Sequence, residues 1–338
     1  MGNYFIGIMT GTSADSLDGC LVSFEKNFKF VESITAELEG NYKSRYEDAI
    51  RAGYKKTSES KDLLLLEKSL NEKTIQLIKE LIKKTKIDFS EISSIGFSGQ
   101  TVFHTNKMSF QIGDPKLISR ETNIDVYSDF RNYDIKNGGL GAPLIPVFHK
   151  YIYSEKNSNK LVFNIGGIAN GTYLQNEKVS LASDVGPGNC LIDYFMKKNF
   201  GQPFDNLGKE AMKGEIDTNL LQRLLSECAD MKYPRADDKK VYYNLIDNSF
   251  DKVDPNSLLR TLTEFTATKI IEFYKFCKKP NDVIFHGGGT KNLFLMNIIK
   301  NEIGKVRTTD GEIPSKYVEA AAFAYLAYLE KGELYLSK

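Results

Sequence analysis

The stretch from Tyr4 to Phe24 reads YFIGIMTGTSADSLDGCLVSF. Residues Tyr4–Met9 are mostly apolar, Thr10–Gly19 are rich in Gly, Thr, Ser and Asp, and Cys20–Phe24 are mostly apolar again. Two apolar runs separated by a glycine-containing turn predict a β-hairpin. A similar stretch, LVFNIGGIAN at Leu161–Asn170, occurs in the second half of the chain. Two such hairpins, one in each half, predict two related domains.

Outside these hairpins, apolar runs and amphipathic segments alternate. We expect helices over 46–54, 61–84, 190–198, 258–278, 291–303 and 317–330, and strands over 92–98 and 282–286. In 61–84, leucine and isoleucine recur at helical spacing, with lysine and glutamate opposite them. The loop-rich stretch 110–146 is where we expect the chain to pass from one domain to the other. Alternating strands and helices predict an α/β protein.

Composition excludes several classes of protein. The 338 residues carry 45 Lys and Arg against 44 Asp and Glu, a net charge of +1, so we expect no nucleic-acid partner. The four cysteines are widely spaced, and three isolated histidines argue against a histidine-rich metal site. Because the sequence shows neither a signal-peptide pattern nor an apolar run of about 20 residues, we expect no membrane association and a cytoplasmic protein.

Three glycine-rich turns follow apolar runs, at Gly11-Thr12-Ser13, Gly166-Gly167 and Gly287-Gly288-Gly289. Glycine lets backbone N–H groups approach a phosphate closely, although each turn alone is more typical of an ordinary connection. The three together favour a nucleotide. Neither the phosphate-binding loop G-x-x-x-x-G-K-[ST] nor the dinucleotide motif G-x-G-x-x-G is present.

Carboxylates stand beside two of these features. Asp15 and Asp18 lie in the first turn, where they could hold Mg²⁺ beside phosphates, or cap the turn. Asp184 precedes Gly186-Pro187-Gly188 and could act as a general base, or cap the helix that follows. Glu319 lies in the first turn of the last predicted helix, where a carboxylate also favours the helix dipole.

The segment GIMTGTSADSLD, Gly7–Asp18, resembles the signature of the anhydro-N-acetylmuramic acid kinases, which belong to the superfamily of sugar kinases, actin and heat-shock chaperone ATPases. The resemblance continues in family order through GQT with His104, FRNYD (130–134), GGLGAPL (138–144), FNIGGIAN (163–170), DVGPGN (184–189), HGGG (286–289), TTD (308–310) and Glu319-Ala320. It therefore covers nearly the whole chain.

This resemblance implies a two-lobed actin-like (ribonuclease H-like) ATPase fold with an inter-domain nucleotide cleft. We expect residues 1–128 with 315–338 to form the first lobe and 129–314 the second. The implied cofactors are ATP and Mg²⁺, the latter on Asp15 and Asp18. The residues expected to bind ATP are Gly11, Thr12, Ser13, Ala14, Asp15, Ser16, Leu17, Asp18, Gly166, Gly167, Gly287, Gly288 and Gly289.

The reaction that the resemblance implies belongs to peptidoglycan recycling. Water adds to the anomeric carbon of 1,6-anhydro-N-acetylmuramic acid, the anhydro bridge opens, and the freed 6-oxygen takes the γ-phosphoryl group to give N-acetylmuramic acid 6-phosphate. Asp184 matches the general base for the water, and Glu319 matches a second carboxylate that helps position it. A homodimer is one assembly that the sequence leaves open.

The residues expected to bind the sugar are Gln100, Thr101, His104 and Arg131. Gln100 and His104 could equally be a structural polar pair, and Arg131 could pair with the substrate carboxylate or form a salt bridge. The family's turn usually has glycine where Ser16 stands. Its PPKSTGRE stretch appears here as YPRADDKK, residues 233–240.

A nucleotide-binding switch without catalysis, which would use the same glycine hairpins, is one alternative. The changed stretch 233–240 leaves open a second, a related kinase for another sugar. If it reaches the sugar, the charges of Asp237 and Asp238 would oppose a carboxylate-bearing substrate.

Overall fold

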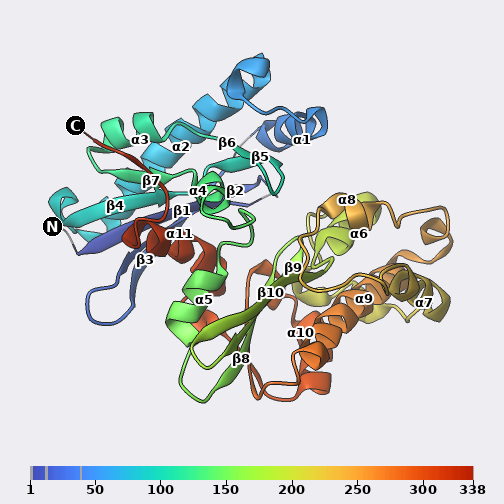
Figure 1. Ribbon diagram of the computed structural model, residues 1–338. Coiled ribbons are helices and arrows are strands. Elements are labelled where there is room, and N and C mark those ends of the chain that lie inside the picture. Colours follow the sequence, from blue (N-terminus) through green and yellow to red (C-terminus); the bar gives the residue numbers. More distant parts are fainter. Residues whose placement is uncertain (1–2, 12–13, 39, 338) are drawn as a thin grey trace. The chain divides into compact units, whose positions relative to one another are not determined.

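The computed structural model describes residues 3–11, 14–38 and 40–337. Its contacts divide the chain into unit 1, Met1–Phe148 with Tyr317–Lys338, and unit 2, His149–Lys316 (Figure 1). Residues 129–148, which we expected in the second lobe, thus group with unit 1. The reason is that Phe130 is buried against Phe323, and Asn132 accepts a hydrogen bond from the backbone N–H of Ser109.

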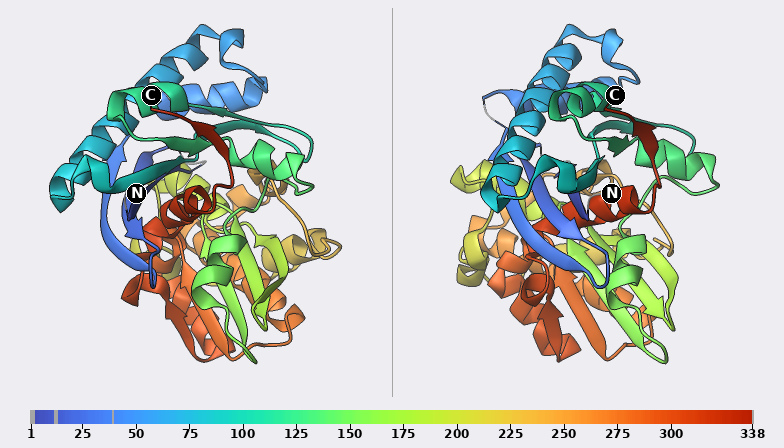
Figure 2. Two further views of the ribbon diagram at one scale, coloured as in Figure 1. Left: turned by 60° about the vertical axis from the view of Figure 1, so that its left-hand side comes forward. Right: turned by 90° about the vertical axis from the view of Figure 1, so that its left-hand side faces the viewer.

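Unit 1 is built on a sheet in the order β13-β7-β4-β1-β2-β3. Its strands are β1 (Tyr4–Thr10), β2 (Ser16–Ser23), β3 (Lys29–Glu37), β4 (Ile92–Phe97), β7 (Val126–Ser128) and β13 (Glu333–Tyr335). β1, β2 and β3 form an antiparallel meander, while β4 and β7 follow parallel to β1. The C-terminal strand β13 returns antiparallel to β7 at the edge of this sheet (Figure 2).

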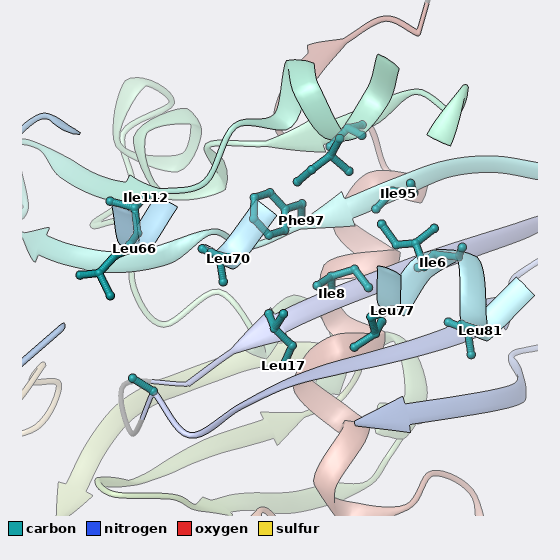
Figure 3. Packing of buried hydrophobic residues seen from close by; sticks show 14 of the residues in the cluster. Ile6, Ile8, Leu17, Leu66, Leu70, Leu77, Leu81, Ile95, Phe97 and Ile112 are labelled. Carbon is teal, nitrogen blue, oxygen red and sulfur yellow. The ribbon is translucent and has the colours of Figure 1, made fainter. Parts of the chain in front are cut away.

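The helices of unit 1 cover both faces of that sheet. They are α1 (Tyr42–Ala52), α2 (Lys61–Thr85), α3 (Pro115–Thr122), α4 (Phe130–Lys136) and α11 (Val318–Tyr328), and a separate hairpin joins β5 (Gln100–His104) to β6 (Ser109–Ile112). Because side chains alternate along a strand, Ile6 and Ile8 pack against the leucines of α2 (Figure 3). Phe5 and Gly7 on the other face of β1 contact α11.

Unit 2 repeats this plan. Its sheet has the order β10-β9-β8-β11-β12, with β8 (Asn159–Ile165), β9 (Ala169–Gln175), β10 (Lys178–Gly186), β11 (Asp282–His286) and β12 (Val306–Thr308). β8, β9 and β10 form an antiparallel meander, and β11 and β12 follow parallel to β8. The order β10-β9-β8-β11-β12 therefore matches β3-β2-β1-β4-β7 of unit 1. The predicted relation between the two halves is confirmed.

The helices assigned to unit 2 enclose two apolar clusters, and α9 contributes buried residues to both. They are α6 (Cys190–Phe200), α7 (Thr218–Glu227), α8 (Lys239–Tyr243), α9 (Pro255–Phe276) and α10 (Leu293–Ile303), and α5 (Pro146–Tyr153) contains the boundary between the units. Across the described residues, every helix is too short or too polar to cross a bilayer.

Two expectations about local structure were wrong. Ser16, Leu17 and Asp18 are not in the first turn but on β2, because they pair with β1 on one side and with β3 on the other. The stretch 110–146 is not mainly loop, because it contains α3, β7, α4 and the last strand of the β5–β6 hairpin.

Candidate active site

Glu319, Arg131 and Asp18 form an interacting group of charges in unit 1. Glu319 is half-buried in the first turn of α11. Burial raises the pKa of its carboxyl to about 7; Arg131 opposes that rise, and the negative charge of Asp18 adds to it. The helix can approach the sheet because Gly7 and Gly96, paired on β1 and β4, face its backbone. The same contacts therefore place Glu319.

Asp18 is oriented by its neighbours on the sheet. Thr35, its partner in the β2–β3 register, donates a hydrogen bond from Oγ1 to Asp18 Oδ1 at 2.7 Å. The Tyr317 hydroxyl lies 2.9 Å from the same Thr35 oxygen. Asp15 is exposed at the end of the turn, and Thr12 and Ser13 lie outside the described residues. The Asp18 carboxylate is thus held in a defined orientation by its pairing with β3.

Gln100 and Thr101 are engaged in holding unit 1 together. The Gln100 side chain is buried; its amide donates to the carbonyl of Gly11 at 3.2 Å and accepts from the Tyr42 hydroxyl at 2.7 Å. The Thr101 carbonyl accepts a hydrogen bond of 2.5 Å from the Tyr46 hydroxyl. These contacts favour the structural interpretation of Gln100, which steadies the first glycine turn.

His104 and Arg131 meet at the loop after α4. Arg131 donates to the carbonyl of Gly141 at 3.0 Å, and a side chain at Gly141 would come within 3.0 Å of the His104 ring. The Gly141 N–H donates to Asp134 at 2.8 Å. Burial, followed by the charge of Arg131, lowers the pKa of His104, and its buried Nδ1 has no hydrogen-bond partner in the described part of the chain. A buried polar atom without a partner is unusual, and it makes His104 a candidate for contact with a ligand.

Asp184 lies near the end of β10 in unit 2. Its Oδ2 accepts a 2.7 Å hydrogen bond from the backbone N–H of Asp237, and its own N–H donates to the carbonyl of Arg235 at 3.0 Å. Helix α6 has Asn189, not Asp184, at its N-cap position. The helix-capping alternative is therefore wrong for Asp184, and the carboxylate is held by a segment that the sequence did not connect with it.

Segment 233–240 places its two acidic side chains differently. Asp237 points inward, with a side chain 6% exposed and a salt bridge of 2.9 Å to Arg235. Asp238 is exposed and caps α8 by accepting from the Lys240 N–H at 2.7 Å. The expectation that both charges oppose the substrate is therefore wrong for Asp237, because Arg235 neutralises it.

The glycine turns of unit 2 combine structural and accessible positions. The carbonyls of Gly166 and Gly167 accept from the N–H groups of Asn189, the N-cap residue of α6, and Cys190, its first residue, at 2.9 and 3.0 Å. A side chain at Gly167 would meet Lys239, whose ammonium lies 2.9 Å from that position. Lys239 is thus a cation beside a predicted phosphate-binding turn, which sequence reasoning missed because the two are far apart along the chain.

The third turn separates one open glycine from two enclosed ones. Gly287 has a φ of 89° and Gly289 is packed against Ile165, so both are needed for the fold. A side chain at Gly288 would meet nothing within 4 Å, and Gly288 is exposed. Gly288 is therefore the position of this turn that a ligand can approach.

The sequence suggested three isolated histidines, but two of them lie side by side in the structure. His149 and His286 are buried, with their Nε2 atoms 2.9 Å apart, and His149 Nδ1 lies 2.9 Å from the Thr172 hydroxyl. Burial lowers the pKa of both rings, that of His286 to about 3, so the pair is neutral. Among the residues that the structure describes, no group of three or more His, Cys, Asp or Glu could hold a metal.

Two α/β units with the same strand order, each opening on a hairpin with a glycine turn, define an actin-like ATPase fold, as predicted. Component A of the (R)-2-hydroxyglutaryl-CoA dehydratase from Acidaminococcus fermentans shares the fold, with a TM-score of 0.53, 12% identity and coverage of 98% of this chain and 99% of that one. The activator of the 2-hydroxyisocaproyl-CoA dehydratase from Clostridium difficile, solved with ADPNP, gives a TM-score of 0.52, 13% identity and coverage of 97% and 95%.

Sequence comparison narrows this class to one family. The family model described as anhydro-N-acetylmuramic acid kinase matches residues 3–334. Proteins named anhydro-N-acetylmuramic acid kinase from Shewanella frigidimarina and Vibrio vulnificus (strain YJ016) are 35% and 31% identical, each over 96% of this chain and 90% of the relative. The chain belongs to the anhydro-N-acetylmuramic acid kinase family, and the predicted family is confirmed.

Proposed function

We propose that this protein is an ATP-dependent kinase that opens the 1,6-anhydro bridge of anhydro-N-acetylmuramic acid and phosphorylates the 6-oxygen. The observation that carries the proposal is the family match over residues 3–334. The product, N-acetylmuramic acid 6-phosphate, returns a cell-wall sugar to metabolism in peptidoglycan recycling. We also propose that the protein works in the cytoplasm, where ATP is available.

In the proposed reaction, the oxygen of a water molecule bonds to the anomeric carbon while the bond from that carbon to the bridging oxygen breaks. The electron pair of the broken bond stays on the 6-oxygen, which attacks the γ-phosphorus and displaces ADP. The proton lost by the water goes to the Asp184 carboxylate. Asp184 is suited to this role because the N–H of Asp237 holds its Oδ2 in place.

Glu319 is the second proposed carboxylate. Its pKa of about 7 means that it changes charge near neutral pH, and the ionised form can accept a hydrogen bond from the attacking water. Arg131 and His104 are the proposed partners of the sugar, since one carries a positive charge and the other has a buried nitrogen without a partner among the described residues. A guanidinium matches the substrate's carboxylate in charge and shape.

For ATP we propose the turn that begins at Gly11 and the turns at Gly166 and Gly288. Gly288 is open to a ligand, and the ammonium of Lys239 beside Gly167 supplies a positive charge for phosphate. Mg²⁺, when bound, neutralises charge on the phosphates. Asp18 and Asp15 would hold it, which fits the preference of Mg²⁺ for one or two carboxylates together with phosphates and water.

Product analysis tests this function. The protein is incubated with Mg-ATP and anhydro-N-acetylmuramic acid in water enriched in ¹⁸O, and the sugar product is measured by mass spectrometry. We expect one phosphoryl group and one labelled oxygen, the label on the anomeric carbon. Phosphorylation of N-acetylmuramic acid, which has no anhydro bridge, without turnover of the anhydrosugar would instead indicate an ordinary sugar kinase.

Asp184→Asn tests the proposed base. The amide keeps the shape of the side chain but cannot take a proton from water, so we expect turnover to fall by about 10²–10⁴-fold. Calorimetry should show ATP binding close to that of the wild type, because the change leaves the proposed ATP turns intact. A near wild-type rate would remove Asp184 from the mechanism.

Light scattering on the wild-type protein measures whether it is the homodimer that the sequence leaves open.

A further inference from the structure

Side chains of residues 234–240 are alternately exposed and mostly buried, and the alternation buries an ion pair between Arg235 and Asp237. The side chains of Arg235 and Asp237 are 11% and 6% exposed, whereas Ala236 and Asp238 face solvent. Arg235 Nε donates to both carboxylate oxygens of Asp237, at 3.1 and 2.9 Å. The buried Tyr242 hydroxyl donates to Asp237 Oδ2 at 2.6 Å. Two side chains from the same short segment, those of Arg235 and Tyr242, therefore fix the Asp237 carboxylate.

The backbone of the same segment is tied to the end of β10. The Arg235 N–H donates to Ser183 Oγ at 2.9 Å, and the Arg235 carbonyl accepts from the Asp184 N–H at 3.0 Å. The third contact reaches a side chain, since the Asp237 N–H donates to Asp184 Oδ2 at 2.7 Å. A short hydrogen bond from an N–H group to a carboxylate is charge-assisted and directional. The place of Asp237 thus decides where Asp184 Oδ2 is held.

Stability alone explains this cluster poorly. A buried ion pair gains little over apolar packing, because both charges lose their hydration. Here the lost hydration of Arg235 is only partly replaced by hydrogen bonds, since its buried Nη2 has no hydrogen-bond partner within the described residues. A cluster that is expensive to bury and in contact with the proposed base is better explained by what it orients.

We infer that Arg235, Asp237 and Tyr242 form a support that positions the Asp184 carboxylate for the reaction. The inference rests on the role proposed above for Asp184. Asp237 is a positioning residue in this scheme, because it acts through Asp184 and has no part in the proton transfer itself. Two contacts with β10 complete the support: Ser183 Oγ accepts from the Arg235 N–H, and the Asp184 N–H donates to the Arg235 carbonyl.

A matched pair of variants tests the inference, Asp237→Asn and Asp238→Asn. Both replace a carboxylate by an amide in the same segment, but Asp238 is exposed and its amide can still cap α8. We expect Asp237→Asn to lower kcat by about tenfold, the size of a charge-assisted hydrogen bond that is weakened. The KM for ATP should stay within about twofold of the wild type, since the effect lies in the chemical step. Asp238→Asn should leave both constants unchanged.

A double-mutant cycle separates positioning from a general loss of structure. In the Asp184→Asn background, Asp237→Asn should lower the residual rate no further, because the group that it positions is already absent. A further tenfold fall there, or a kcat for Asp237→Asn equal to that of Asp238→Asn, would overturn the inference. If Asp237→Asn does not fold, Tyr242→Phe takes its place in the same cycle, since it removes one donor and keeps the ring.

The proposed function and this inference fail separately. A wild-type protein that does not turn over the anhydrosugar refutes the proposed function. An active wild type with an unaffected Asp237→Asn refutes only the positioning of Asp184.

Discussion

Replacing Gly7 by alanine should displace the helix that carries Glu319. A methyl carbon at Gly7 would lie 2.7 Å from the carbonyl carbon of Ala320 and 2.9 Å from the nitrogen of Ala324, with the Ala320 oxygen closer still. Ordinary contacts of this kind are 3.4–4 Å long. The obstacle is backbone on both sides, strand β1 and helix α11, so no side chain can turn away. The helix must therefore retreat by about 1 Å or more.

The size of the effect follows from that clash. Overpacking of a core contact destabilises a protein by about 1–3 kcal/mol, and an obstacle made of backbone favours the upper end. For a unit of this size, each kcal/mol lowers the melting temperature by roughly 2–4 °C, so we expect a fall of about 6–12 °C. Because Glu319 precedes Ala320 on the helix, kcat should fall as well, by up to about 100-fold for a displacement near 1 Å.

Thermal melting followed by circular dichroism, with steady-state kinetics below the melting range, measures both effects. Gly311→Ala is the matched control, since a side chain at Gly311 would meet nothing within 4 Å and should leave melting and kcat unchanged. A Gly7→Ala protein that melts and turns over like this control would refute the close approach of α11 to β1 as the feature that places Glu319.

Two further results are expected. Because only ionised Glu319 can orient the water, kcat should rise with pH through about 7, and Glu319→Gln should remove that rise. The raised pKa of Glu319 also means that its contribution to stability is present below about pH 4.5 and is lost as the pH rises through about 7. Urea unfolding across this pH range measures that loss. Gly288→Ala should melt like the wild type but bind ATP more weakly by calorimetry, whereas Gly289→Ala should lower the melting temperature, since its side chain would lie 2.7 Å from Ile165 Cβ. Equal melting of these two glycine variants would contradict the distinction between an open and an enclosed position.

Much of the fold could be predicted because apolar runs and glycine turns mark the first two strands of each unit. The opening hairpin and its counterpart at Leu161–Asn170 were predicted from these signals alone. β3 was missed because its residues, KFVESITAE, are partly exposed along the whole strand, so they show no buried run. An edge strand of this kind is defined by its pairing with β2, which no local pattern reports.

Single residues of the site were harder to predict than its elements. Asp184 stood out because a carboxylate followed by a glycine turn is a local pattern, and Glu319 was matched through the family resemblance. The contact that holds Asp184 comes from a backbone N–H more than fifty residues away along the chain. Every residue except proline has such a donor, so its use leaves no mark in the sequence.

Asp237 and Asp238 show why charge along a sequence does not give its effect. The two residues are adjacent and equal in charge, and Coulomb's law alone predicts the same repulsion from each toward an anionic sugar. The extended backbone turns one side chain inward, where Arg235 and Tyr242 neutralise and bind it, and the next outward to cap α8. An aspartate paired in this way presents little net charge to a ligand. Asp237 therefore gives no electrostatic reason to expect a different sugar, whereas the exposed Asp238 keeps its charge. The proposed consequence of Asp237 for the reaction is the hold of its segment on Asp184.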